Sequence, residues 1–310
     1  MRIFNVGLMC DDAGNGWTDA VKLRATGGYL QLRCGESVAE FNQKLLQMTL
    51  DFRPQLVILQ IQAPNILYPD VLNQISRIAF VIEYSGDVRN GLPPHYIQTG
   101  NCISMSCFSN MRDVKLAREA GLKSEWVEIG YDPEKYKSWD VPASTEVVAH
   151  FNDYGDGFFP ESKYRREVVE TLRTNFGDKF GVFGNFPGAN SNFNHDQILE
   201  SKNYCGAKIA ISVSHFCIPK YASDRLIRAL GSGVFVLSHY FEGIEEMYTV
   251  GEHLDVFHNL QELTEKVNYY LEHEDERKRI AAAGQEYVKR TYTFENMIDN
   301  LIKLYEKWKT

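Results

Sequence analysis

The sequence predicts a two-domain α/β protein in which each domain carries a mainly parallel sheet covered by helices. Short apolar runs alternate with segments of helical periodicity along the chain. Residues 55–61 (QLVILQI) and 77–84 (RIAFVIEY) are runs typical of strands that are buried on both faces. The length of 310 residues is typical of two domains, and alternating strands and helices indicate parallel sheets with helices on both sides.

The first half of the chain predicts one such domain. We expect strands at residues 2–8, 55–61, 77–84, 102–107 and 126–129, and helices at 39–50 and 110–120. Residues 131–145 hold two prolines and few aliphatic side chains, which is typical of a linker. We therefore expect a Rossmann-like domain over residues 1–140.

The second half repeats the same alternation. We expect strands at 146–151, 179–184, 208–213 and 234–238, and helices at 162–175, 223–230, 261–271 and 274–290. These elements predict a second Rossmann-like domain over residues 141–290. Residues 291–310 have apolar side chains at positions i, i+3, i+4 and i+7, which predicts an amphipathic helix with a partner face. Parallel sheets bind ligands beyond the carboxyl ends of their strands, so we expect a site in the cleft that the two domains face.

Composition excludes several classes of protein. The chain has 33 basic and 41 acidic residues, and a net charge of −8 does not favour non-specific binding to a nucleic acid backbone. It contains no apolar run long enough to cross a membrane, and its N-terminus reads as a strand. Its six cysteines form no Cys-x-x-Cys pair, so we expect reduced thiols and no metal. We expect a cytoplasmic protein, of a bacterium or of the host cell if a phage encodes it.

Residues 221–248 carry the strongest chemical signal. Ser223 or Asp224 can cap a helix, and Arg225 and Arg228 share one face near its start. A helix N-terminus with two guanidiniums beside it suits a diphosphate. The alternative is an ordinary α/β unit whose arginines are solvated. A second junction of loop and helix follows the next strand, where Gly243 permits a close approach of the backbone to a ligand.

These residues resemble a known family. The stretches SDRLIRALGSGVFVLS, EGIEEMY and GEHLDVF are similar to the donor-binding half of GT-B glycosyltransferases. So are the segment from Phe159 to Leu172 and the last two helices, with AAAGQ and TYTF. The likeness is strongest to the group-1-type domain of spore-maturation-like (CgeB-like) glycosyltransferases. It covers residues 147–304 well and the first half weakly.

The resemblance implies a hexosyl- or pentosyltransferase that uses a nucleotide-diphosphate sugar. By position, Ser223, Arg225 and Arg228 would contact the donor. Gly243, Ile244 and Glu245 would lie beneath its phosphates, and the last helix would cross back to the first domain. The chain has no Asp-x-Asp at an expected metal position, so the leaving phosphates would be stabilised by arginines and helix dipoles, with no obligatory metal or other cofactor.

One position departs from the family. Many relatives have a glutamate that holds the ribose hydroxyls where this chain has Arg228, and Lys220 stands where their preceding glutamate would be. Arginine cannot accept a hydrogen bond. Either Arg228 binds a phosphate or the nucleotide is held differently, so the nucleotide and sugar stay open.

The first domain offers candidates for catalysis and for acceptor binding. Asp87 follows an expected strand and is our first candidate for the general base of an inverting transfer, with Asp19 as the second. A retaining transfer would need no such base. For Asp87 the alternative is a turn or a salt bridge to Arg89, which we otherwise expect at the acceptor. Trp17 would stack on a sugar or base, or else cover the core.

Three further features of the second domain are ambiguous. His215 follows an expected strand and would contact the donor, unless it is a structural histidine. Lys163, Arg165 and Arg166 are more typical of a solvated first turn of a helix than of an anion site. The aromatic loop at residues 151–159 lacks the terminal glutamate of a calcium-binding loop, so we assign it to the rim of the cleft.

Two other functions fit the same sequence. A sugar-nucleotide epimerase of the same fold would form product without an acceptor. A non-catalytic two-lobed scaffold would neither hydrolyse nor transfer from any donor. For the transferase, the acceptor hydroxyl could belong to a glycan, a protein, a small molecule or a modified DNA base, and the acidic net charge weighs mildly against duplex DNA.

Overall fold

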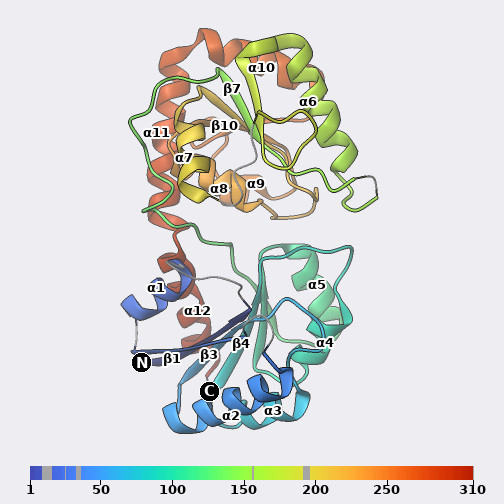
Figure 1. Ribbon diagram of the computed structural model, residues 1–310, viewed down its shortest axis with the longest axis vertical. Coiled ribbons are helices and arrows are strands. Elements are labelled where there is room, and N and C mark those ends of the chain that lie inside the picture. The colour runs from blue at the N-terminus through green and yellow to red at the C-terminus, as the bar shows by residue number, and fades with distance from the viewer. Residues whose placement is uncertain (9–15, 25, 33–35, 156, 191–195, 310) are drawn as a thin grey trace. The chain divides into compact units, whose positions relative to one another are not determined.

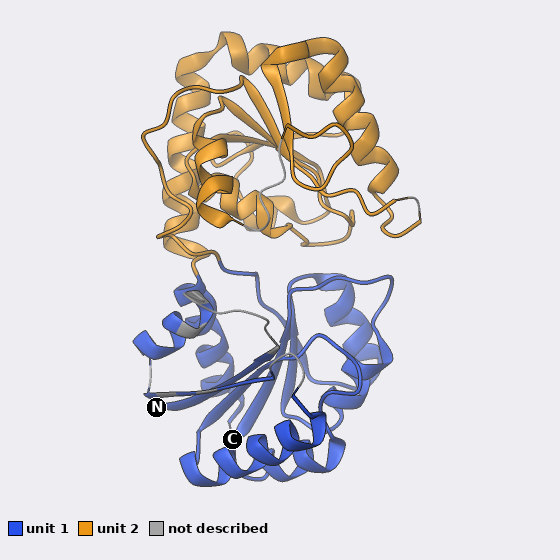
Figure 2. Cartoon of the chain, in the orientation of Figure 1, with its two compact units in different colours: residues 1–130, 294–310 blue, residues 131–293 orange. Residues whose placement is uncertain are grey.

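The expected architecture of two parallel-sheet α/β domains is confirmed. A computed structural model describes residues 1–8, 16–24, 26–32, 36–155, 157–190 and 196–309 (Figure 1). The chain forms two compact units (Figure 2). Unit 1 comprises residues 1–130 and 294–310, and unit 2 comprises residues 131–293.

The sheet of unit 1 has six parallel strands in the order β2–β1–β3–β4–β5–β6. The strands are β1 (Arg2–Leu8), β2 (Thr26–Leu32), β3 (Leu56–Gln60), β4 (Phe80–Ser85), β5 (Met105–Phe108) and β6 (Ser124–Trp126). Strand β4 begins later than the sequence suggested, because the N–H groups of Ile78 and Ala79 bond to the carbonyl of Ile75 at the end of a helix. Strand β2 was not expected, since two glycines lower its strand propensity.

Helices cover both faces of this sheet (Figure 1). One face is covered by α2 (Val38–Phe52) and α3 (Pro69–Ile75), which pack on it through Phe41, Leu45 and Leu72. Two further helices, α4 (Pro94–Gly100) and α5 (Met111–Glu119), bury Tyr96 and Val114 beside Phe108. Helices α1 (Gly16–Arg24) and α12 (Phe294–Trp308) cover the other face. The apolar stripe predicted for the last helix therefore packs within unit 1.

The sheet of unit 2 has five parallel strands in the order β11–β10–β9–β7–β8. They are β7 (Val147–His150), β8 (Phe180–Phe183), β9 (Ile209–Ser212), β10 (Phe235–His239) and β11 (Asp255–Phe257). Helices α6 (Ser162–Phe176) and α10 (Leu260–Glu272) share one core with the sheet. The remaining helices are α7 (Gln197–Cys205), α8 (Asp224–Gly231), α9 (Ile244–Met247) and α11 (Glu274–Thr291), with a 3₁₀ turn at Gly177–Lys179.

Residues 131–145, which the sequence suggested as a linker, pack within unit 2. Tyr131 pairs with Thr293 in an isolated bridge, and Tyr136 is buried. The hydroxyl of Tyr136 donates a hydrogen bond of 2.7 Å to Oε2 of Glu200 on α7. This segment therefore contributes a side chain to the polar network beside the candidate site.

Candidate anion-binding site in unit 2

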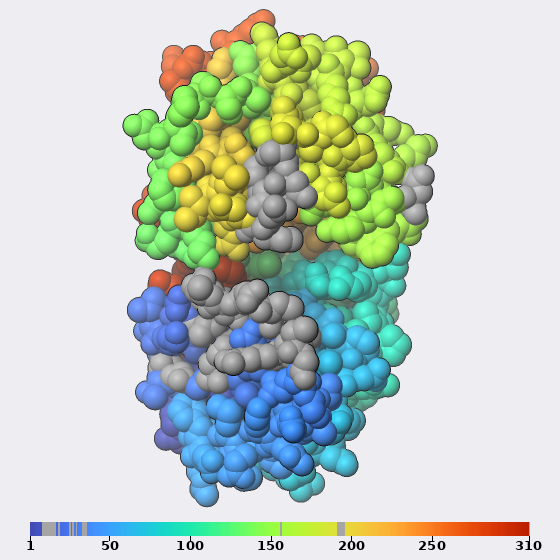
Figure 3. All heavy atoms as spheres, viewed as in Figure 1, coloured from blue at the N-terminus to red at the C-terminus, as the bar shows by residue number. Residues whose placement is uncertain are grey.

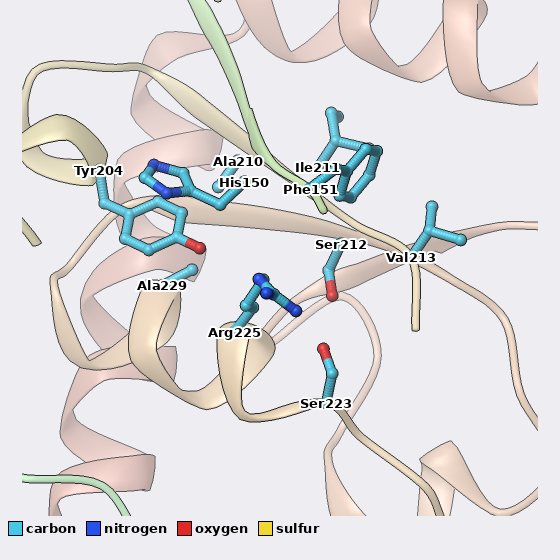
Figure 4. A pocket seen from close by; sticks show the side chains of 10 residues that line it. All are labelled: His150, Phe151, Tyr204, Ala210, Ile211, Ser212, Val213, Ser223, Arg225 and Ala229. Carbon is cyan, nitrogen blue, oxygen red and sulfur yellow. The ribbon is translucent and has the colours of Figure 1, made fainter. Parts of the chain in front are cut away.

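A hollow lies at the carboxyl ends of β7 and β9, beside the first turn of α8 (Figure 4). It has about 230 Å³ of empty space, open solvent included. Its polar walls come from Ser212 at the end of β9 and from Ser223 and Arg225 at the start of α8. The other lining residues are His150, Phe151, Tyr204, Ala210, Ile211, Val213 and Ala229.

The start of α8 is fixed by its flanking residues. Ser223 is the N-cap residue with extended backbone, and its N–H donates a hydrogen bond of 3.1 Å to Oγ of Ser214. Its own hydroxyl forms no capping bond, so it remains available at the wall of the hollow. Leu226, Ile227 and Leu230 are buried on the opposite side of the helix. The helix therefore presents its N-terminus, with a partial positive charge, at the sheet edge.

The two arginines of α8 are in different environments. Arg228 forms ion pairs with Asp224 at 2.9 Å and with Glu200 at 3.5 Å. Arg225 lines the hollow and, within the described part of the chain, forms no ion pair with a carboxylate. In Figure 4 its guanidinium lies beside the hydroxyls of Ser212 and Ser223. Arg225 is therefore the guanidinium of α8 that is placed to bind an anion.

Arg228 instead belongs to a partly buried polar network. Its guanidinium lies 5.3 Å from the ring centroid of Tyr136, which bonds the same Glu200. Burial opposes the charge of Arg228, but Asp224 and Glu200 hold its pKa above the usual value. Burial also acts to raise the pKa of Asp224, yet Arg228 and Arg225 lower it below its ordinary value. In this structure Arg228 is therefore held by two carboxylates.

Arg165 on α6 is a buried guanidinium close to the same edge. Its exposed fraction is 1%, its guanidinium carbon lies 4.4 Å from the ring centroid of Phe151, and Nη1 donates a hydrogen bond of 3.1 Å to the carbonyl of Asn152. Nε has no hydrogen-bond partner, and among the described residues Arg165 forms no ion pair. Burial, aided by Arg225, lowers its pKa to about 9, so it is still charged at neutral pH.

His215 links Arg165 to the surface. Nη1 of Arg165 lies 2.6 Å from Nδ1 and 2.8 Å from Nε2 of the imidazole. Burial, with Arg165 and Arg225, lowers the pKa of His215 to about 3. A neutral imidazole can accept a hydrogen bond from the guanidinium. The structure thus brings His215 into one cluster with Arg165, in a region of positive potential.

Sequence reasoning missed Arg165, which we expected to be solvated with Lys163 and Arg166. That expectation is wrong for Arg165, because the residue lies on the buried stripe of α6 with Val168, Val169 and Leu172. Its spacing of three and seven residues from the apolar positions was the signal that could have found it. Arg166 pairs with Asp153 at 3.2 Å, and Lys163 is exposed.

The second expected phosphate contact does not line the hollow. Gly243 has a φ of +82° and precedes the four-residue helix α9. Ile244 is buried in the core, whereas Glu245 is exposed. A Cβ at position 243 would lie 2.8 Å from Cγ of Lys220, so this junction needs glycine for its own packing.

In unit 1 the structure places Asp87 just beyond the carboxyl end of β4. Its N–H donates a hydrogen bond of 2.8 Å to Oε1 of Gln62, and its carboxylate pairs with Arg89 at 2.7 Å. Both side chains of the pair are about half exposed. The salt bridge that we considered as the alternative for Asp87 is therefore present, and it also holds Arg89.

Two other predicted residues of unit 1 contact neighbouring side chains of the same unit. Trp17 is buried between Tyr84 and Phe294, and its Nε1 donates a hydrogen bond of 2.9 Å to Oδ1 of Asn5. The structure thus shows the core contact that was the alternative for this residue. Asp19 is exposed on α1 and pairs with Lys22 at 3.3 Å.

Among the described residues, no three or more His, Cys, Asp or Glu side chains are grouped to hold a metal ion. No helix in the described ranges is both long and apolar enough to cross a bilayer.

A comparison with known protein families finds sequence similarity in the second half of the chain. Residues 165–303 match the family model described as "Glycosyl transferase-like". This range contains Arg165, His215, Ser223, Arg225 and Arg228. No curated protein matches the sequence.

Solved structures with the same fold are GT-B proteins. The Anabaena protein HepE, crystallised in complex with UDP and glucose, has a TM-score of 0.66 and 13% identity, covering 99% of this chain and 100% of that one. A Rickettsia africae glycosyltransferase has a TM-score of 0.67 and 12% identity, with coverages of 100% and 99%. The Thermosynechococcus elongatus sucrose-phosphate synthase has a TM-score of 0.64 and 9% identity, with 99% of both chains covered. The chain therefore has the GT-B fold.

Proposed function

We propose that this protein is a glycosyltransferase that moves a sugar from a nucleotide-diphosphate sugar to a hydroxyl acceptor. The observation that carries the proposal is the pair of guanidiniums, Arg165 and Arg225, near the carboxyl edge of the unit 2 sheet with no carboxylate partner among the described residues. A buried charge is unfavourable unless something compensates it, and a diphosphate would do so. The similarity of residues 165–303 to a glycosyl transferase-like family and the UDP bound by HepE support this assignment.

In this proposal unit 2 stabilises the leaving group. Arg225, the hydroxyls of Ser212 and Ser223 and the N-terminus of α8 bind the diphosphate, and Arg165 adds its charge from behind His215. As the bond between the sugar and the diphosphate breaks, negative charge grows on the leaving oxygen. Donors that are already in place stabilise that charge without reorganisation. The backbone at Gly243, Ile244 and Glu245 remains a proposed contact beneath the phosphates.

For an inverting transfer we propose Asp87 as the general base. Its backbone is held by Gln62 and its carboxylate by Arg89, so the group has a defined orientation and stays partly exposed. The base must take the proton of the acceptor hydroxyl as that oxygen attacks the sugar. Asp87→Asn should then lower kcat by 10²- to 10⁴-fold and leave nucleotide binding intact. A variant with wild-type kcat would remove Asp87 from the mechanism.

The first experiment is a thermal shift with UDP, GDP, ADP, dTDP and CDP, each with and without Mg²⁺. A ligand at about 100 times its Kd stabilises the folded state by about 2.7 kcal/mol. We expect one diphosphate to raise the melting temperature, and Arg225→Ala to abolish the shift. Lys163→Ala is the matched control, since it removes an exposed cation of the same unit that pairs with Glu167.

The nucleotide identified in this way names the donor to be tested for turnover. Incubation of the nucleotide sugar with the enzyme should release the diphosphate, slowly to water and faster with an acceptor. Isomerisation of the sugar without release would instead identify an epimerase. No shift with any diphosphate and no release from any donor would refute the proposed function.

A further inference from the structure

An exposed aromatic surface lies beside the candidate anion site. It is formed by Tyr154, Phe158 and Phe159 in the loop between β7 and α6, and we call these three side chains the aromatic platform. The rings of Tyr154 and Phe158 are stacked, with centroids 5.6 Å apart and an interplanar angle of 27°. Phe159 stands edge-on to both, at 5.4 Å and 4.7 Å. Tyr154 is 50% exposed and Phe158 is 60% exposed, so core packing does not explain them.

The backbone around the platform holds it in place. Gly155 and Gly157 have φ values of +86° and +79°, which side-chain-bearing residues rarely adopt. The N–H of Gly155 donates to Oδ1 of Asp153 at 2.9 Å, and the N–H of Asp153 donates to the carbonyl of Asn185 at 2.7 Å. These bonds anchor Asp153 and Gly155 at the base of the loop.

The platform is continuous with the anion site. The ring of Phe159 lies 4.3 Å from that of His215, centroid to centroid, and the ring of Tyr154 lies 5.6 Å from it. His215 in turn contacts Arg165. None of the three platform residues lines the hollow itself. Figure 3 shows the yellow-green side chains of this loop and α6 on the outside of unit 2. A molecule on the platform would therefore lie next to a diphosphate bound at the anion site.

The charged residues around the platform are paired with one another, which favours an uncharged ligand. Arg166 is paired with Asp153 at 3.2 Å, and Lys163 is paired with Glu167 at 3.6 Å. The described cations on this stretch of surface are therefore already neutralised, unlike those of a surface that binds nucleic acid or anionic lipid. The platform also has polar groups at its edge, since Nδ2 of Asn152 donates a hydrogen bond to the hydroxyl of Tyr154 at 3.3 Å.

We propose that the aromatic platform binds a sugar ring of the acceptor, which is a neutral carbohydrate. A pyranose has an apolar face that packs on an aromatic ring and hydroxyls at its edge that bond to amides and carboxylates, and this matches rings bordered by Asn152 and Asp153. The proposal rests on the proposed function, because it places the acceptor next to the donor phosphates. Of the acceptors that the sequence left open, namely a glycan, a protein, a small molecule or a modified DNA base, the proposal selects a glycan.

Direct binding tests the platform without any donor. Saturation-transfer NMR with maltose, cellobiose and lactose should show contact of at least one of them with the wild-type protein. The double variant Tyr154→Ala/Phe158→Ala should weaken that Kd, by roughly three- to tenfold for each ring lost. Tyr269→Ala is the matched control, because it removes another exposed tyrosine of unit 2 and should change nothing. Tyr154→Phe keeps the ring and should bind like wild type.

Turnover separates the acceptor from the donor. With the donor named by the diphosphate screen, transfer to the bound disaccharide should show a raised KM for the sugar in the double variant. Diphosphate affinity and slow donor hydrolysis should stay within about twofold of wild type. An equal loss of diphosphate affinity would place the rings at the nucleotide and overturn the proposal. Binding of single-stranded DNA or of anionic vesicles in place of sugars, or no sugar binding at all, would also overturn it.

If no diphosphate binds, the proposed function fails, while the NMR result still decides whether the platform binds sugars.

Discussion

Replacing Arg165 by methionine should separate the stability of the protein from its affinity for the donor. Methionine fills a similar volume in an apolar site and removes the charge. In the structure this guanidinium is almost fully buried, with hydrogen bonds to the carbonyl of Asn152 and to His215 and a neighbouring aromatic ring, and it has no ion pair within the described residues. We expect Arg165→Met to bind the diphosphate weakly and yet to remain folded, with a small change in the free energy of unfolding.

The size of the effect follows from the environment of Arg165. A pKa of about 9, against an ordinary 12.5, corresponds to about 5 kcal/mol against the charged form. The hydrogen bonds to Asn152 and His215 together return about 3–6 kcal/mol, and the contact with Phe151 returns about 1–2 kcal/mol. The stability of the ligand-free variant should therefore lie between a loss of about 3 kcal/mol and a gain of about 1 kcal/mol. Loss of the positive charge behind His215 should weaken diphosphate binding by roughly 10-fold.

Calorimetry measures the affinity for the diphosphate, and urea unfolding measures the stability of the same samples. Arg173→Met is the matched control, since Arg173 is exposed on the same helix and bonds only to the carbonyls of Pro187 and Gly188 in the described structure. It should leave diphosphate affinity unchanged. Arg165→Lys keeps the positive charge but loses the planar guanidinium. Its affinity for the diphosphate should therefore lie between that of the wild type and that of the methionine variant. A methionine variant that is destabilised and binds the diphosphate normally would refute the reasoning, because Arg165 would then be purely structural.

Three further predictions concern stability. Arg228→Met should cost about 1–3 kcal/mol at pH 7, because it leaves Asp224 and Glu200 without their shared cation. Arg228 helps to hold the pKa of Asp224 low. The loss of unfolding free energy in Arg228→Met should therefore shrink as the pH falls below about 4 and Asp224 takes up a proton, which urea unfolding at a series of pH values would measure. Glu83→Gln should stabilise the protein increasingly above about pH 5, by about 1.4 kcal/mol per pH unit. Burial raises the pKa of this carboxyl, which has no hydrogen-bond partner among the described residues, so the folded state keeps its proton while the unfolded state loses it. A difference in stability that does not depend on pH would contradict this. Gly284→Ala should destabilise the protein by about 1–3 kcal/mol, although alanine has the better helix propensity. The added Cβ would lie 2.1 Å from the carbonyl oxygen of His253, and a thermal melt would measure the loss.

The sequence specified the fold through its buried strands. Runs such as residues 56–60 are continuously apolar because a central parallel strand is covered on both faces, and this pattern needs no tertiary information. The elements that escaped prediction lack such a pattern. Helices α3 and α4 have seven residues each and begin at proline, which is too short for a helical period to stand out. Strand β2 contains two glycines.

The candidate site was less accessible to sequence reasoning because it depends on pairing between distant residues. Arg225 and Arg228 lie three residues apart on one helix. Arg228 is neutralised by Asp224, four residues earlier on the same helix, and by Glu200, which lies on a helix that was not predicted. Arg165 was misjudged because a charged residue near a helix start is usually solvated, whereas here it occupies the buried stripe.

The pairing of the arginines with carboxylates indicates the charge of the ligand that would bind between them. Helix α6 carries one paired arginine, Arg166, and one without a described carboxylate partner, Arg165. Helix α8 repeats this with Arg228 and Arg225. The two arginines without such partners are close enough for Arg225 to lower the pKa of Arg165, so each destabilises the other in the ligand-free protein. An anion with two or more negative charges would relieve this repulsion, whereas a neutral sugar would not. Inorganic diphosphate alone should therefore raise the melting temperature, more at low than at high salt, and a chain that responds only to the complete nucleotide sugar would show that the two arginines do not bind the phosphates.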